Sequence, residues 1–317
     1  MVSFHRLKEW IWSHLKKPIG LAIGMASQFF LIPLLAFSFV KICEIHALYA
    51  TGMMIVSCCS GGSSSNMITY FCEGDVSLSV AMTTCSTIIA LGMMPFNLWI
   101  YSHGIDTGAV TIPYWKMAVS LIIILLPLAF GMILKVKLPK VAPIFTKLGS
   151  YSGYGIILII QVMELFIFPD IFDDAPFTLY IAALVMPSGG IILGIVCGRI
   201  FRQSWTICRT IGIEAGFQNV GTALTVISLS FPFKIQREVI LFPALYGFSM
   251  MCAGFLMAIL FQIYKRFSRR KSENVTDGAL KEALHLEITE KTENDIEDSN
   301  AESKMLQELK QTSTVKN

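Results

Sequence analysis

Long apolar segments separated by short polar loops dominate the sequence. A helix that crosses a bilayer needs about 20 mostly apolar residues, and eight segments meet this requirement. They lie at roughly 18–40, 46–73, 77–101, 113–136, 147–168, 177–201, 207–231 and 237–265. A short basic segment, 1–17, precedes them, and a polar tail, 267–317, follows. The pattern predicts an all-α polytopic membrane protein with about eight transmembrane helices.

The composition supports lipid as the main solvent of this chain. Hydrophobic residues make up 54% of the 317 residues and charged residues only 15%, whereas soluble domains average about 25% charged residues. The mean hydropathy is +0.62. Basic residues form no stripe with interleaved aromatics, so we expect no nucleic-acid partner. The eight cysteines form none of the paired patterns typical of zinc sites.

Lys and Arg gather in the loops on one side of the predicted helices. The segments that carry them are 1–17, 135–147, 199–209 and 265–271. Two of the alternate loops, 102–112 and 169–176, carry Asp and neither Lys nor Arg, whereas a third, 231–238, carries Lys234 and Arg237 and fits the pattern least well. Because basic loops stay in the cytoplasm, both termini are predicted to be cytoplasmic in a multi-pass protein of the plasma membrane. The tail alternates charges and is predicted to be disordered.

The second and seventh segments contain residues that oppose a continuous helix. Residues 57–66 read SCCSGGSSSN, and residues 214–221 read EAGFQNVG. Gly costs about 1 kcal/mol relative to Ala in a helix interior, and Ser competes for backbone hydrogen bonds, so we expect unwinding near 60–65. Two interrupted helices in corresponding positions are typical of a transporter binding site. Each is the middle segment of a triplet, which predicts an inverted repeat.

Glu214 constrains the function more than any other polar residue. An ionised carboxylate near the bilayer centre costs at least about 2.5 kcal/mol, and no Lys or Arg lies near mid-depth in a predicted segment. Its partner is therefore a proton or a bound cation. Oxygen-bearing side chains nearby favour a hard cation such as sodium. They belong to Ser65, Asn66, Ser79, Thr83 and Gln218.

Several motifs resemble the sodium/bile acid cotransporter family. They are GGSSSN at 61–66, GDVSLSVAMTTCST at 74–87, ALGMMP at 90–95, CRTIGIEAGFQNV at 208–220 and LFPALYGF at 241–248. The resemblance covers roughly residues 2–266 and is nearest to the branch that carries bile acids and steroid sulfates. It implies a core domain built from two repeats, 18–101 and 177–266, which rocks against a panel domain, 113–168.

The resemblance also implies two sodium sites where the broken helices cross. The first site would use Ser65, Asn66, Ser79, Thr83 and Glu214. The second would use Gln28, Glu214 and Gln218, with backbone carbonyls near 215–217. Asn219, Ser64 and Gly221 would border the substrate cleft.

Some positions depart from the family pattern. The family usually has Pro where this chain has Ser60, Thr where it has Ala215, and often Gln where it has Gly221. The changes at Ala215 and Gly221 remove polar groups near the cleft and are expected to alter substrate choice or weaken transport. Residues 2–17 match the loop after the family's first helix, so the resemblance implies that this helix is missing here.

The predicted function is sodium-coupled symport of amphipathic organic anions, such as bile salts or steroid sulfates, into the cell. The expected partners are the anion, sodium and the lipid bilayer. No cofactor is expected beyond the coupling ions, and a homodimer stays open. One alternative is a proton-coupled carrier that uses Glu214. Another is a truncated or orphan member that folds in the membrane without transporting. An intramembrane enzyme would need a paired catalytic acid or metal set that the sequence lacks, so we expect no enzyme.

Overall fold

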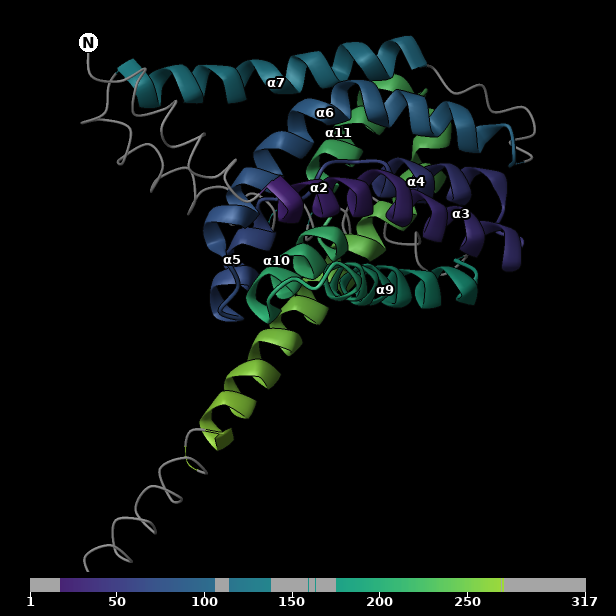
Figure 1. Cartoon of the computed structure of the whole chain (residues 1–317). Helices are drawn as coiled ribbons and strands as arrows, with labels where there is room; N and C mark the ends of the chain where they lie inside the picture. Colours follow the sequence, from purple (N-terminus) through teal and green to yellow (C-terminus); the bar gives the residue numbers. More distant parts are fainter. Residues whose placement is uncertain are drawn as a thin grey trace, which may run out of the picture. The chain divides into compact units, whose positions relative to one another are not determined.

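The computed structural model describes residues 18–105, 114–137, 159, 163, 175–268 and 270, and the regular elements among them are helices. In chain order they are α2 (Pro18–Ala26), the π-helical turn η1 (Ser27–Leu31), α3 (Ile32–Ile42), α4 (Ala47–Ser57), α5 (Ser64–Phe71), α6 (Val76–Ser102), α7 (Tyr114–Lys137), α9 (Phe177–Ile200), α10 (Trp205–Gly216) and α11 (Val220–Ser230) (Figure 1). An apolar span, Phe233–Ser268, follows. The chain divides into two compact units, Met1–Ile259 and Leu260–Asn317, and all the labelled helices belong to the first.

Four of the described helices are long and apolar enough to cross a membrane. They are Ile19–Ile42, Val76–Ser102, Phe177–Ile200 and Phe233–Ser268. Each agrees with a predicted segment to within four residues at either end. The chain is therefore a helical protein of the membrane.

Two other predicted segments have different outcomes. The prediction at 113–136 corresponds to α7. The one at 147–168 lies outside the described residues, apart from Ile159 and Met163. The N-terminal segment 1–17 and the tail from residue 271 lie outside them as well.

The second and seventh segments are both broken, as predicted from their glycines and polar residues. In the second segment α4 ends at Ser57 and α5 begins at Ser64. Unwinding predicted near 60–65 is therefore right for 60–63 and wrong for Ser64 and Ser65, which lie in the first turn of α5. Serine suits a helix start because its hydroxyl can satisfy local backbone groups. In the seventh segment the break covers 217–219, between α10 and α11.

The two unwound stretches cross and satisfy each other's backbone groups. Gly61 and Gln218 form an antiparallel bridge. The Gly62 N–H donates to the Phe217 carbonyl at 2.7 Å, and the Asn219 N–H donates to the Ser60 carbonyl at 2.9 Å. An unpaired backbone group inside a bilayer costs several kcal/mol, so each break supplies the partners that the other needs.

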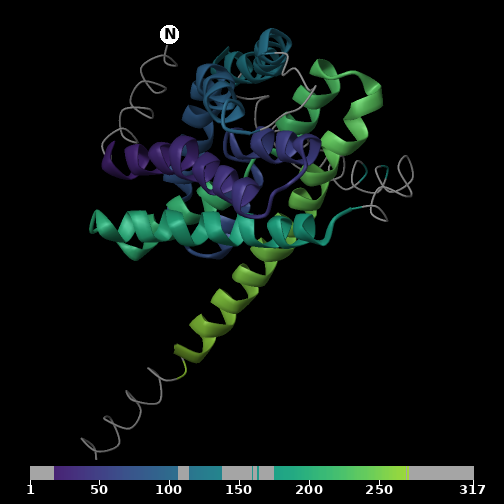
Figure 2. The same ribbon diagram turned by 90° about the vertical axis from the view of Figure 1, so that its right-hand side faces the viewer.

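Glycines allow α9 to pack closely on α10. A Cβ added at Gly194 would lie 2.7 Å from the Cα of Gly212, and one added at Gly190 would lie 2.9 Å from the Cα of Gly216. Larger residues would separate the two helices, since small residues are what allow helix backbones to approach in a membrane. Figure 2 shows α9 running beside the first span, α2 to α3, which also contacts α9.

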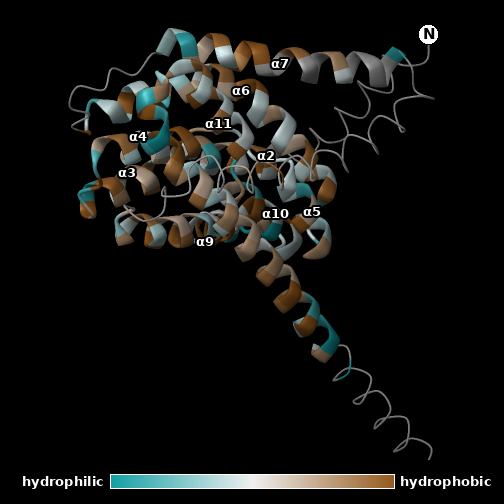
Figure 3. Ribbon diagram, turned by 180° about the vertical axis from the view of Figure 1, so that it is seen from behind, coloured by the Kyte–Doolittle hydropathy of each residue, from teal (hydrophilic) through white to brown (hydrophobic). Residues whose placement is uncertain are grey.

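The outer helix faces are apolar, as a lipid solvent requires. Figure 3 shows many hydrophobic residues along α9. Leu184, Ile192 and Val196 are among the exposed side chains there, and Leu126 and Phe130 are exposed on α7. Gln28, Ser65, Glu214 and Gln218 are polar side chains that are instead buried, at or beside the crossing of the two breaks.

Candidate ion-binding site

The carboxylate of Glu214 lies at the centre of a cluster of hydroxyl groups. Glu214 is in the last turn of α10 and is fully buried. Ser65 Oγ donates to its Oε2 at 2.6 Å, Ser79 Oγ donates to the same oxygen at 3.0 Å, and Thr83 Oγ1 donates to Oε1 at 2.5 Å. No Lys or Arg among the described residues pairs with this carboxylate. Its charge is therefore balanced by a proton or a bound cation.

Three helices carry the groups that meet at this site. Ser65 is in the first turn of α5, while Ser79 and Thr83 are four residues apart and share one face of α6. Asp75 fixes the start of α6, because its Oδ1 accepts the Leu78 N–H at 3.0 Å. The four-residue spacing predicted a shared face for Ser79 and Thr83, and both hydroxyls donate to Glu214.

Asn66, the fifth residue predicted for the first sodium site, has an oxygen that lacks a protein donor. Its Nδ2 donates to the Ser63 carbonyl at 3.2 Å, while its Oδ1 is buried without a hydrogen-bond partner in the described part of the chain. A buried acceptor left unpaired costs about 1–3 kcal/mol. A cation or a water molecule would satisfy this oxygen, so the donor set fits sodium.

The second predicted site joins two glutamine side chains across the crossing. Gln28 is in η1, and its Nε2 donates to the Cys59 carbonyl at 2.9 Å and to Gln218 Oε1 at 2.6 Å. Gln28 Oε1 is a second buried oxygen without a hydrogen-bond partner among the described residues. Neither amide forms a hydrogen bond with Glu214 in the described residues. The structure therefore brings Gln28 and Gln218 together, but among the described residues no hydrogen bond joins this pair to Glu214.

The carbonyls at 215–217 each accept one hydrogen bond from the described part of the chain. Gln218 Nε2 donates to Ala215 at 2.9 Å, the Tyr246 hydroxyl to Gly216 at 2.8 Å, and the Gly62 N–H to Phe217 at 2.7 Å. A carbonyl oxygen has two lone pairs. One bond to each therefore orients these oxygens and still leaves them able to coordinate an ion.

The three residues predicted to border the substrate cleft lie at the starts of α5 and α11. Ser64 is buried at the first position of α5, and Asn219 is half-buried. Asn219 Oδ1 caps α11 by accepting the Thr222 N–H at 3.1 Å. Gly221 is exposed, and a Cβ added to it would meet only Asn219 Oδ1, at 3.6 Å. Of the three, Gly221 is therefore the most exposed.

A family model shows to which protein family this chain belongs. The model described as the sodium bile acid symporter family matches residues 2–167, a stretch of 166 residues in a chain of 317. The chain belongs to the sodium bile acid symporter family. Members of this family are transporters and not enzymes, which confirms that expectation from the sequence.

Individual relatives are similar to this family member over more of its length than the family model covers. The sodium-dependent organic anion transporter of Bos taurus is 34% identical over 266 residues, which cover 83% of this chain and 70% of the relative. The ileal sodium/bile acid cotransporter of Homo sapiens is 35% identical over 266 residues, covering 84% and 76%. That of Mus musculus is 35% identical over 262 residues, covering 82% and 75%. These are the two kinds of relative that the motifs indicated.

Tyr246 is a residue of the candidate site that the sequence reasoning missed. It is only 1% exposed, and its hydroxyl holds the Gly216 carbonyl at the end of α10. A buried tyrosine usually places its hydroxyl against a partner. The sequence signal was therefore a tyrosine within an apolar span, but nothing in the sequence indicated a partner 30 residues away.

The substitution Tyr246→Phe is expected to weaken sodium dependence. It removes the donor to Gly216, and a buried acceptor left unpaired costs about 1–3 kcal/mol, which disturbs the carbonyls nearest to Gln218. The sodium concentration for half-maximal uptake should rise severalfold at unchanged surface abundance. Tyr264→Phe, at a position 70% exposed, is the matched control. Equal sodium dependence in both variants would show that the hydroxyl has no role.

Proposed function

We propose that this family member couples the entry of amphipathic organic anions to sodium ions bound at the crossing of its broken helices. The observation that carries the proposal is the buried Glu214 carboxylate, which is surrounded by hydroxyl donors and not by a basic residue of the described chain. Two further buried oxygens, on Asn66 and Gln28, lack hydrogen-bond partners among the described residues. Carboxylate, amide and hydroxyl oxygens are the ligands that hard cations prefer.

Two sodium ions are the coupling ions in this proposal. The first is bound by Ser65, Asn66, Ser79, Thr83 and Glu214, where the ion neutralises the carboxylate. The second is bound by Gln28 and Gln218 with the carbonyls at 215–217, and shares the field of Glu214. Binding both ions draws the two broken segments together and so prepares the cleft for the anion.

The anionic end of the substrate is proposed to lie near the starts of α5 and α11. Both helices begin at the crossing. A helix N-terminus carries a partial positive charge, so it favours an anion, and transporters with broken helices use this feature. Ser64, Asn219 and Gly221 border this region. An apolar cleft with few fixed cations suits a bile salt or a steroid sulfate.

The driving force is large enough for strong accumulation. Two sodium ions with one monoanion move one net charge, which gains about 2.3 kcal/mol per 100 mV. Two tenfold sodium gradients add about 2.8 kcal/mol, at about 1.4 kcal/mol each. The sum supports an accumulation of about a thousandfold or somewhat more.

The two repeats, 18–101 and 177–266, are proposed to form a core that rocks against a panel, 113–168. Alternating access of this kind needs a rigid core, and the close packing of α9 on α10 favours one. Both termini are proposed to be cytoplasmic in the plasma membrane. Arg199, Arg202 and Arg209 all lie at or near the loop between α9 and α10, as a cytoplasmic loop would require.

Uptake in cells that express the 317-residue chain tests the proposal. Labelled taurocholate and estrone sulfate would be supplied in sodium or in choline at fixed pH, with surface biotinylation alongside. We expect sodium-dependent uptake of at least one anion and background uptake in choline. Uptake that persists in choline and follows pH would instead show a proton-coupled carrier. Surface expression without uptake of either anion would favour a member that does not transport these anions.

A further inference from the structure

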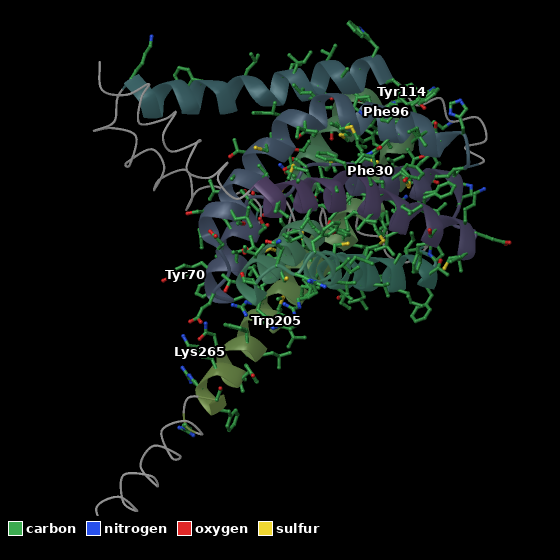
Figure 4. All side chains as sticks on the ribbon, viewed as in Figure 1. Phe30, Tyr70, Phe96, Tyr114, Trp205 and Lys265 are labelled. Carbon is green, nitrogen blue, oxygen red and sulfur yellow. The ribbon has the colours of Figure 1, made fainter. Side chains whose placement is uncertain are left out.

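Asn97 forms a buried hydrogen bond that the proposed sodium sites do not explain. It lies in the second half of α6 and is 3% exposed. Its Nδ2 donates to the backbone carbonyl of Phe29, 68 residues earlier, at 2.7 Å. Phe30 follows Phe29 and Phe96 precedes Asn97, and the side chains of both Phe30 and Phe96 are exposed (Figure 4). The bond therefore lies on the inner faces of the first span and of α6.

Pro33 explains why the Phe29 carbonyl needs an external donor. In an α-helix this carbonyl would accept the N–H of the residue four positions later. That residue is Pro33, which has no N–H and whose ring clashes with the carbonyl four residues before it. The helix responds by widening into the π-helical turn Ser27–Leu31, in which the Ile32 N–H reaches the Ser27 carbonyl. Asn97 then supplies the N–H that Pro33 lacks.

The same turn presents Gln28 to the crossing. Gln28 is adjacent to Phe29 within η1 and is fully buried. Its Nε2 meets the Cys59 carbonyl of one break and Gln218 of the other. A π-helical turn changes the direction in which its side chains point, and such turns are frequent at functional sites. A change in η1 would therefore move the Gln28 amide relative to both breaks.

We propose that Asn97 is a positioning residue for sodium binding: it holds the widened turn at Phe29 and so fixes Gln28 against Gln218. The proposal rests on the proposed sodium coupling. Outer residues that orient metal ligands typically change metal affinity by about 10–100-fold when they are mutated. The hydrogen bond of Asn97 goes to neither Gln28 nor Glu214, so its effect is transmitted through the backbone of η1.

The substitution Asn97→Leu tests the proposal, because leucine has a similar size and no donor. We expect the sodium concentration for half-maximal uptake of labelled taurocholate or estrone sulfate to rise roughly tenfold. The Hill coefficient for sodium should fall, while the KM for the anion at saturating sodium should change much less. Met94→Leu is the matched control, since Met94 is buried one turn away on α6 and this swap preserves volume.

A double-mutant cycle with Pro33→Ala separates this role from a general loss of stability. Alanine restores an N–H at position 33, so the Phe29 carbonyl regains a backbone donor. In the Pro33→Ala background, Asn97→Leu should have little further effect on sodium dependence, which gives a non-additive cycle. If Asn97→Leu alone fails to reach the surface, the double variant should restore surface abundance. Additive effects, or no restoration, would overturn the proposal.

The same experiment distinguishes failure of this inference from failure of sodium coupling. If the wild-type chain takes up anions without sodium dependence, the proposed coupling fails, and the positioning role with it. If wild-type uptake depends on sodium and Asn97→Leu has the wild-type sodium dependence at normal surface abundance, only the positioning role fails.

Discussion

The substitution Glu214→Gln is expected to abolish sodium-dependent uptake. Glutamine has the shape of glutamate and can still contact Ser65, Ser79 and Thr83, but it lacks the charge that attracts a cation. If the ion contributes at least the roughly 2.5 kcal/mol that a carboxylate costs at the bilayer centre, the loss of affinity is about 60-fold or more. Uptake of labelled taurocholate and estrone sulfate in sodium should therefore fall to the level seen in choline.

The matched control for this variant is Glu44→Gln. Glu44 is exposed and lies between α3 and α4, and it is not among the residues that bond to Glu214. It should transport as the wild type does. We expect surface biotinylation to show equal abundance for both variants, because glutamine removes a buried charge at position 214 without changing the side-chain volume. Sodium-dependent uptake by Glu214→Gln at wild-type rates would contradict the assigned ion site.

The second large effect is expected from Gly61→Ala. A Cβ at position 61 would lie 2.5 Å from Glu214 Oε1, closer than non-bonded atoms approach, and 3.1 Å from its Cδ, which is a tight contact. The carboxylate would have to move away from the hydroxyls that hold it, and each hydrogen bond lost in a buried site costs about 1–3 kcal/mol. Sodium-dependent uptake should be lost almost completely, as measured by initial rates at physiological sodium.

Gly92→Ala is the control for this prediction. Gly92 lies in α6, and an added Cβ there would meet no atom of the described residues within 4 Å. Alanine also favours a helix more than glycine does, so uptake and surface abundance should match the wild type or exceed it. A Gly61→Ala variant that transports normally would show that the carboxylate is free to relocate, and the described geometry would not then be required.

The parts of the structure that the sequence predicted are those set by local pattern. Apolar runs predicted the four long spans, and dense Gly and Ser residues predicted the break before α5. The four-residue spacing of Ser79 and Thr83 predicted that their hydroxyls share a face, and both meet Glu214. Residues close in sequence, or fixed by helical periodicity, were therefore accessible without a structure.

The parts that the sequence missed depend on contacts between distant residues. Pro33 signals a disturbed helix, but whether the helix kinks or widens depends on the donor that reaches Phe29. That donor comes from Asn97, which in isolation reads as one polar residue in an apolar span. Tyr246 was missed for the same reason. Its partner, the Gly216 carbonyl, is available to an outside donor because α10 ends there.

Transport into proteoliposomes tests the central proposal most directly. The purified chain would be reconstituted with the membrane potential held at zero and a tenfold inward sodium gradient, and the equilibrium distribution of labelled taurocholate or estrone sulfate would be measured. Two coupled sodium ions predict that the anion ratio follows the square of the sodium ratio, which is about a hundredfold accumulation. An anion distribution that stays equal on both sides, whatever the sodium gradient, would contradict the coupling.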